Sequence, residues 1–336
     1  MVTQIIYSKK FDLHNNIRHP ENNSRTTIMM SELKKAPFYE KLDIIEPEEI
    51  LPEKKLYELH SKRMIKEVKE RSMKDESWID LDTYVNKNDF ETARLAAGSV
   101  LTACQNVMKG KIENAFCMVR PPGHHATPER SMGFCLFNNT AIAANEITKK
   151  GKKVLVIDPD VHHGNGTQDS FYDRNDVLYQ SIHLSPHFPG TGDISEIGKD
   201  KGKGYNINAP LSYSYGNKAA NQILDEIFLP IAEQFKPDLI IMSTGFDSHH
   251  SDPLGGLRYT ADFYGKITKK YQEIQPKIVC TIEGGYNLDW IGKCFISQVA
   301  QLTDEKIDIK DNVSSKSDIK KLKEEIKKNI FEFWDI

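Results

Sequence analysis

The sequence predicts an α/β fold with a mainly parallel sheet and helices on both of its faces. Short apolar runs rich in β-branched residues recur from residue 115 onward, and helical stretches lie between several of them. Such near-continuous apolar strands are typical of a parallel sheet that is covered on both faces. The expected strands are residues 115–119, 153–158, 177–184, 238–243 and 277–283.

The expected helices follow from residue spacing and from the absence of proline. The segment from Ser31 to Glu76 is charged and mostly helical in pattern. From Glu91 to Met108, small and apolar residues without proline predict a buried helix. The helices expected between the strands are residues 140–150, 217–235 and 260–271.

The end of the chain predicts one more helix. After Asp304 the chain is charge-rich, and apolar side chains recur at helical spacing, which predicts an amphipathic helix at about 316–333. We expect this helix to pack on the chain's own core; a helix that binds a partner is the less favoured alternative. No repeat or flexible linker divides the chain, so we expect a single domain over residues 1–336 with a motif core at 115–300.

Composition excludes several classes of protein. The 45 Lys+Arg and 48 Asp+Glu give a formal net charge of −3, which argues against a nucleic-acid partner. No apolar run is long enough to cross a bilayer, so no membrane association is expected. The five cysteines are odd in number and mostly lie in apolar runs, which favours reduced thiols and a cytoplasmic location.

Polar residues follow four of the expected strands. Eight of the 11 histidines lie between residues 124 and 250, and three pairs of them are adjacent in the sequence. Ligand sites of open α/β sheets lie at the carboxyl ends of the strands, so these four endings predict one shared site. The endings read RPPGHH, PDVHHGNG, TGFDSHH and GGYN.

One of these endings has the spacing of a metal site. Asp158, Asp160 and His162 alternate along extended backbone, so their side chains share one side, and Asp247 comes from another strand end. Two carboxylates and an imidazole around an open position are typical of a catalytic metal site. A single aspartate at a strand end is more often a turn former, but four acidic or imidazole groups together favour the metal.

Two other endings offer proton transfer and oxyanion stabilisation. His124 and His125 follow a rigid Pro-Pro-Gly turn and suit general acid and base catalysis, although exposed loop histidines are the alternative. Tyr286, after two glycines, suits an oxyanion donor, although a packing role is the alternative. No G-x-S-x-G, dinucleotide or P-loop pattern occurs, which disfavours a serine nucleophile and nucleotide chemistry.

Five ordered motifs resemble the histone deacetylase superfamily, which includes acetylpolyamine amidohydrolases. The resemblance covers roughly Tyr7 to Ala300, and Asn165 makes it most similar to the class II branch and its prokaryotic relatives. It implies a single arginase-like or deacetylase-like α/β domain with zinc at the strand ends. The motifs are RPPGHHATPERSMGFCLFNN, VLVIDPDVHHGNGTQD, SIHLSPHFPGTGD, STGFDSHHSDPLGG and EGGYN.

The resemblance also implies a role for each motif residue. The zinc ligands would be Asp160, His162 and Asp247, although ferrous iron also suits these donors. His124 and His125 would be the tandem histidines, with His125 the general base and then acid, and Tyr286 would bind the oxyanion. The remaining implied positions are Asp158 and Ser181 at a structural potassium ion, His163 and Asn165 supporting the ligands and the base, and Gly133, Phe134, Phe188 and Asp82 lining the substrate tunnel.

These roles together imply zinc-dependent hydrolysis of an N-acyl amide. Acetyl-lysine in proteins is the favoured substrate, and an acetylated polyamine or another small amine is the nearer alternative. A catalytically weak protein that binds acyl-lysine is the more distant one. An oligomer is compatible with the sequence. The remaining clustered histidines, at 183, 187, 249 and 250, are expected in loops or at the pocket rim.

Overall fold

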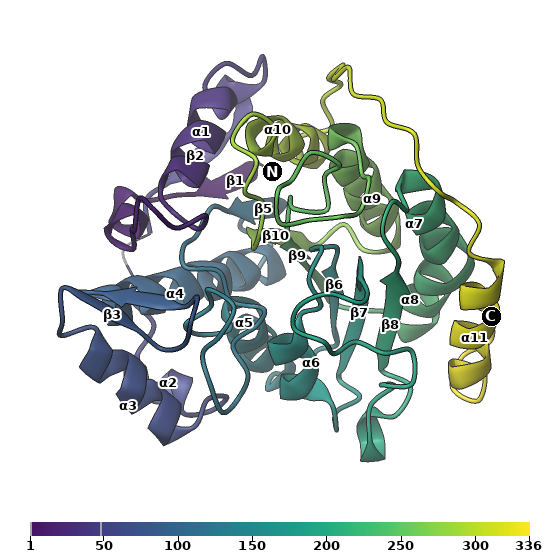
Figure 1. The fold of residues 1–336 in the computed structure, drawn as a ribbon, viewed down its shortest axis with the longest axis horizontal. Coiled ribbons are helices and arrows are strands. Elements are labelled where there is room, and N and C mark those ends of the chain that lie inside the picture. Colours follow the sequence, from purple (N-terminus) through teal and green to yellow (C-terminus); the bar gives the residue numbers. More distant parts are fainter. Residues whose placement is uncertain (1, 48) are drawn as a thin grey trace.

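An eight-stranded parallel sheet forms the centre of the molecule in the computed structural model, which describes residues 2–47 and 49–336 (Figure 1). Its strand order is β2-β1-β5-β10-β9-β6-β7-β8. The strands are β1 (Thr3–Ile6), β2 (Asp43–Ile45), β5 (Asn114–Cys117), β6 (Val154–Asp158), β7 (Val177–Leu184), β8 (Asn206–Leu211), β9 (Leu239–Thr244) and β10 (Ile278–Ile282). All five strands expected from the sequence are therefore present within a few residues.

Apolar residues on successive strand positions fill two separate cores. In β6, Val154 and Val156 belong to the core on one face, and Leu155 and Ile157 to the core on the other. Side chains alternate between faces along a strand, so a continuous apolar run is what a sheet buried on both sides requires.

Helices cover both faces, as Figure 1 shows. One face carries α4 (Asp89–Met108) and α5 (Asn139–Thr148), while α9 (Ala261–Ile274) and α10 (Ile291–Leu302) pack together on the other. The remaining helices are α1 (Ser24–Leu33), α2 (Glu53–Leu56), α3 (Lys62–Arg71), α6 (Asn165–Phe171), α7 (Asn217–Ile223), α8 (Leu229–Phe235) and α11 (Lys320–Ile330), with the short helices η1 (Lys9–Leu13), η2 (Tyr39–Lys41) and η3 (Asp200–Gly202).

The predicted helix at 217–235 is continuous but not uniform. A π-helical turn, η4 (Leu224–Phe228), separates α7 from α8, and Pro230 lies at the start of α8. Proline has no N–H and cannot complete a regular α-helical ladder, so the wider turn comes directly before it.

The charged segment from Ser31 to Glu76 is less helical than its pattern predicts. It contains the end of α1, η2, α2 and α3, but also β2, which pairs with β1 at an edge of the sheet. A separate hairpin then begins with β3 (Glu76–Trp78) and continues with β4 (Tyr84–Asn86). The helical prediction for this segment was therefore wrong over residues 43–45, where two β-branched isoleucines favour a strand that pairs with β1.

The C-terminal helix is present and shorter than predicted. In Figure 1, α11 lies beside β8 and α8, at the end of an irregular segment that leaves α10. Ile326 and Ile330 are buried against the main core. The apolar stripe therefore packs on its own domain, as expected. No helix in the described ranges combines the length and apolarity needed to cross a membrane.

Candidate active site

The four strand endings identified in the sequence belong to the four central strands. The strands β5, β10, β9 and β6 are consecutive neighbours in the sheet, so their carboxyl ends meet at one edge. This adjacency explains how polar groups from residues far apart in the sequence reach the same place.

Asp160, His162 and Asp247 converge there as a carboxylate–imidazole–carboxylate group. His162 Nδ1 lies 3.1 Å from Asp160 Oδ1 and 3.3 Å from Asp247 Oδ2. One ligand atom from each residue lies within 4.8 Å of the other two, and both carboxylates are fully buried. The structure therefore brings together the three residues that the motif implies as metal ligands.

Several observations fit a cation between these three groups. Asp247 Oδ2 is buried without a hydrogen-bond partner among the described residues. Two glycines leave room for the carboxylates, because a Cβ would lie 1.8 Å from Asp160 Oδ2 at Gly245 and 1.9 Å from Asp247 Oδ2 at Gly284. Buried carboxylates require charge compensation, and a divalent cation provides it.

The same crowding shifts the pKa values of the group. Burial would raise the pKa of Asp160, but His124 and His162 outweigh it and lower this pKa. Burial and the neighbouring Asp160 raise the pKa of Asp247. For His162, burial is opposed by both carboxylates, which raise its pKa to about 10. The ring is thus in an environment that strongly favours a positive charge.

The tandem histidines lie beside this group, with ring centroids 4.0 Å apart. Each ring uses Nδ1 to contact its own acceptor, which is Asp158 Oδ2 at 3.1 Å for His124 and Asn165 Oδ1 at 2.8 Å for His125. Neither Nε2 has a hydrogen-bond partner within the described ranges, and both rings line the pocket. The geometry leaves both Nε2 atoms available to a bound molecule.

Their surroundings give the two rings different protonation states at neutral pH. Burial lowers the pKa of His124, but the carboxylates of Asp160 and Asp158 outweigh it and raise the pKa to about 10. Burial holds the pKa of His125 well below its usual value, and the charge on His124 lowers it further. For Asp158, burial raises the pKa to about 6. His125 is therefore the neutral base of the pair and His124 the charged partner.

Glu283 holds the histidine turn in place, a role that the sequence did not reveal. Its Oε2 accepts hydrogen bonds from the N–H groups of Gly123 and His124, at 2.7 and 3.1 Å. Its Oε1 accepts from Ser243 Oγ at 2.6 Å. The glutamate begins the EGGYN motif, but nothing in that motif indicates that its partner is the turn after β5.

Tyr286 lines the pocket, and two residues outside its own motif hold it there. Its N–H donates to Asp252 Oδ2 at 2.7 Å. The guanidinium of Arg25 lies 5.0 Å from the centre of its ring and donates to the carbonyls of Gly285 and Glu283. Arg25 is 260 residues from its acceptor Gly285, and no local pattern marks it as part of the site. Burial raises the pKa of Tyr286 well above its usual value, so the phenol keeps its proton.

The pocket is a narrow cavity of about 200 Å³. It contains all four residues implied as tunnel lining, and both phenylalanines lie edge-on to site rings, Phe134 to Tyr286 and Phe188 to His125. His187 is part of the wall and stacks on His162 with centroids 4.9 Å apart. The lining residues are Asp82, Pro122, His124, His125, Gly133, Phe134, Cys135, His162, His187, Phe188, Leu254, Gly284 and Tyr286.

Ser181 and His163 lie outside the pocket lining. Ser181 is paired with Asp158 in the β6–β7 register, and its hydroxyl lies 2.9 Å from His183 Nδ1. His163 contacts Thr191 Oγ1 and Gln168 Oε1 through its two ring nitrogens. Neither residue belongs to the trio of potential metal ligands.

The other clustered histidines divide into three cases. His187 is in the pocket wall, close to the expected rim, and His183 is fully buried rather than in a loop. That prediction was wrong for His183 because the ring lies on β7 and bonds Ser181 and the carbonyl of Gly192. His249 and His250 are in a loop, as expected, but they do not line the pocket.

This sheet and this pocket together define an α/β protein with its candidate site at the carboxyl ends of parallel strands. The histone deacetylase domain family matches residues 19–302, and the chain belongs to that family. It is therefore a hydrolase of the histone deacetylase family, which agrees with the motifs in its sequence.

Individual relatives support the same assignment. The chain is 36% identical over 298 residues to a probable deacetylase of Archaeoglobus fulgidus, which covers 86% of this chain and 82% of that protein. Histone deacetylase 18 of Arabidopsis thaliana is 39% identical over 76% of this chain, but only 40% of the plant protein is covered. The crystal structure of the HDA15 HD domain superposes with a TM-score of 0.93 at 32% identity, covering 99% and 95% of the two chains.

Proposed function

We propose that the protein is a zinc-dependent deacetylase that hydrolyses acetyl-lysine in proteins. The observation that carries this proposal is the carboxylate–imidazole–carboxylate trio, with both carboxylates buried, beside a neutral histidine that lines the same pocket as His162. When bound by Asp160, His162 and Asp247, zinc would supply a Lewis acid for the acyl carbonyl and for the attacking water. Ferrous iron suits the same donors.

The tandem histidines and Tyr286 divide the remaining work. His125 is neutral, and its free Nε2 takes the proton from the attacking water. His124, held charged by neighbouring carboxylates, stabilises negative charge near it, and a protonated ring of the pair then gives a proton to the leaving amine. The phenol of Tyr286 keeps its proton and donates to the developing oxyanion.

The shape of the pocket favours an extended acyl-lysine chain. Phe134 and Phe188 provide apolar walls for a methylene chain, and Asp82 offers a carboxylate at the same cavity. The acetylated polyamine remains the second candidate, because Asp80 lies beside Asp82 and the two carboxylates would attract a cationic amine. Burial and the neighbouring Asp80 raise the pKa of Asp82.

Two further predictions belong to this proposal. We propose a structural potassium ion at Asp158 and Ser181, which are buried and paired across β6 and β7. We also propose a cytoplasmic location, supported by five cysteines that are all buried and free.

Acetate release by the zinc-loaded protein tests the proposed activity. Acetyl-lysine peptides, acetylated polyamines and longer acyl-lysine peptides are compared at equal concentration. We expect the peptide to give the highest kcat/KM, and Asp247→Ala to lose activity and the zinc equivalent held by the trio. A higher kcat/KM on acetylated polyamines would make the acetylated polyamine the substrate in place of acetyl-lysine. Peptide binding without acetate release would instead indicate a protein that binds acyl-lysine and does not hydrolyse it.

Full zinc occupancy in Asp247→Ala would contradict the ligand assignment. Elemental analysis of the purified variant measures this directly. Asp193→Ala is the matched control, because Asp193 is an exposed aspartate whose carboxylate, among the described residues, accepts hydrogen bonds from Ser195 alone.

A further inference from the structure

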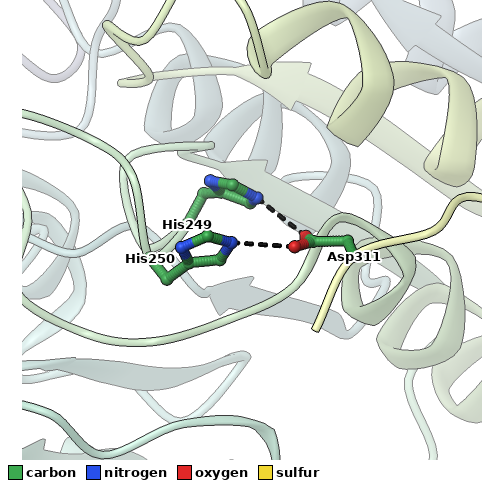
Figure 2. Close-up of side chains that lie close together, drawn as sticks. All are labelled: His249, His250 and Asp311. Carbon is green, nitrogen blue, oxygen red and sulfur yellow. Dashed lines mark hydrogen bonds and ion pairs between the residues drawn. The ribbon is translucent and has the colours of Figure 1, made fainter. Parts of the chain in front are cut away.

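A second cluster of metal-ligating side chains lies outside the pocket. His249, His250 and Asp311 bring two imidazoles and a carboxylate together, with one ligand atom of each within 4.8 Å of the others. Figure 2 shows both rings directed at the same carboxylate. His249 Nε2 lies 2.9 Å from Asp311 Oδ2, and His250 Nε2 lies 2.8 Å from Asp311 Oδ1.

The cluster is a built site rather than a surface contact. The side chains of His249 and Asp311 are 1% and 2% exposed, whereas that of His250 is 18% exposed and leaves a route from solvent. His249 stacks on Trp290 with ring centroids 4.6 Å apart, which fixes its orientation. Asp311 Oδ2 also accepts the N–H of Ala261 at 2.8 Å, which fixes the carboxylate.

For Nε2 to bind a cation, the proton of each neutral ring must lie on Nδ1, so the contacts of Nδ1 matter. His250 Nε2 donates its proton to Asp311 Oδ1, so Nδ1 accepts from the hydroxyl of Ser251 at 3.0 Å. When a cation replaces the proton on Nε2, this hydroxyl can rotate and accept from Nδ1–H instead. His249 Nδ1 lies 3.3 Å from the N–H of Ser251, the longest contact in the cluster. Metal binding at His249 Nε2 places the proton on Nδ1 and requires this one weak contact to open.

We propose that His249, His250 and Asp311 form a second transition-metal site, of the zinc type, that joins the C-terminal segment to the catalytic loop. Two imidazoles and one carboxylate, with water in the fourth position, are a common ligand set for Zn²⁺. The donors come from different parts of the chain: the histidines follow β9, and Asp311 lies in the irregular segment between α10 and α11.

The position of this site gives it a structural role. The loop that carries the two histidines also carries Asp247 of the trio and Asp252, which holds the N–H of Tyr286. A cation bound by Asp311 would therefore fasten the C-terminal segment to the loop on which the pocket depends. The inference needs no deacetylase activity, because it rests on a different set of ligands.

Zinc stoichiometry by equilibrium dialysis tests this inference, with His162→Ala used to remove the catalytic trio. We expect two equivalents in the wild type, one in His162→Ala and none in His162→Ala/Asp311→Ala. His250→Ala serves as a second variant, because its partly exposed ring makes a folding defect less severe. Asp308→Ala is the matched control, since it removes an exposed aspartate from the same segment.

The outcomes separate this site from the catalytic one. If the trio binds no zinc, the wild type holds one equivalent, which His162→Ala retains and Asp311→Ala loses. The inference is overturned if His162→Ala binds no zinc with a Kd below about 10 μM. It is also overturned if the zinc of His162→Ala persists when Asp311 and His250 are each replaced. The cluster would then be a hydrogen-bonded clamp.

Discussion

Two of the three adjacent-histidine pairs have similar ring spacing but make different contacts. The rings of His124 and His125 have centroids 4.0 Å apart, and those of His249 and His250 have centroids 4.3 Å apart. Both pairs follow a strand of the central sheet. In His124 and His125, Nδ1 of each ring contacts a separate acceptor. In His249 and His250, Nε2 of both rings contacts the carboxylate of Asp311.

The hydrogen-bond acceptor near each ring, rather than the His-His sequence itself, therefore determines which ring nitrogen remains available. A ring anchored through Nδ1 presents Nε2 to a ligand, which suits proton transfer. In the second pair, Nε2 of each ring faces the shared carboxylate and Nδ1 contacts Ser251, so neither nitrogen is free for a substrate.

The strongest challenge replaces one ring in each pair. His125→Ala should lower kcat by about 10²–10⁴-fold, because it removes the neutral base of the pocket. His250→Ala should change kcat by no more than about threefold, because its ring lies outside the pocket. Steady-state kinetics on an acetyl-lysine peptide compare the two variants. Equal losses in both would break the contrast.

Tyr286→Phe measures how much the phenol hydroxyl, rather than the tandem histidines, contributes to kcat. Loss of the phenol should lower kcat by about 10²–10³-fold, as the loss of an oxyanion donor typically does. The ring contacts with Phe134 and Arg25 survive this change, so the fold should be unaffected. Single-turnover kinetics with circular dichroism as the folding control provide the measurement. Wild-type turnover would remove Tyr286 from the chemistry.

The sequence predicted the parts of the site that are local or periodic. Asp160 and His162 could be found because both lie in the short segment that directly follows β6, and Asp247 because it follows another strand. The joint position of these endings also followed, because parallel strands end at a common edge. The five strands expected from the sequence could be predicted because each is a continuous apolar run.

The rest of the fold and site depends on pairing between distant residues. The strand β8 contains two asparagines and Pro210, a composition that is tolerated at the edge of a sheet. It has no continuous apolar run, so it was not predicted from the sequence. Arg25 acts on residues about 260 positions away, and Asp311 meets histidines about 60 positions away. No spacing within a short window encodes such contacts, so these residues could not be assigned from the sequence.

A third histidine, His60, stabilises the fold rather than binding a ligand. Both of its ring nitrogens are hydrogen-bonded to the backbone: Nδ1 donates to the carbonyl of Thr127, and Nε2 accepts from the N–H of Asn138. Burial lowers the pKa of this ring from 6.5 to about 4. The folded state thus favours neutral His60, and its contribution is complete above pH 6.5 and is lost as pH falls toward 4.

This loss should reach about 3 kcal/mol near pH 4. Urea unfolding at several pH values measures it, with His60→Gln as the non-titrating comparison. The difference in slope between wild type and variant should correspond to about one proton between pH 6.5 and 4. Parallel profiles would show that His60 protonates equally in the folded and unfolded chains.

The smallest effect concerns the second pair without metal. His249→Ala should lower the free energy of unfolding by about 1–3 kcal/mol, because Asp311 loses a buried hydrogen bond and Trp290 loses a stacked ring. Urea unfolding of metal-free protein isolates these contacts from any cation. His250→Ala, with a more exposed ring, should cost less than His249→Ala. If neither variant changes the free energy of unfolding, the two hydrogen bonds to Asp311 contribute nothing on their own, and any fastening of this loop depends on the cation.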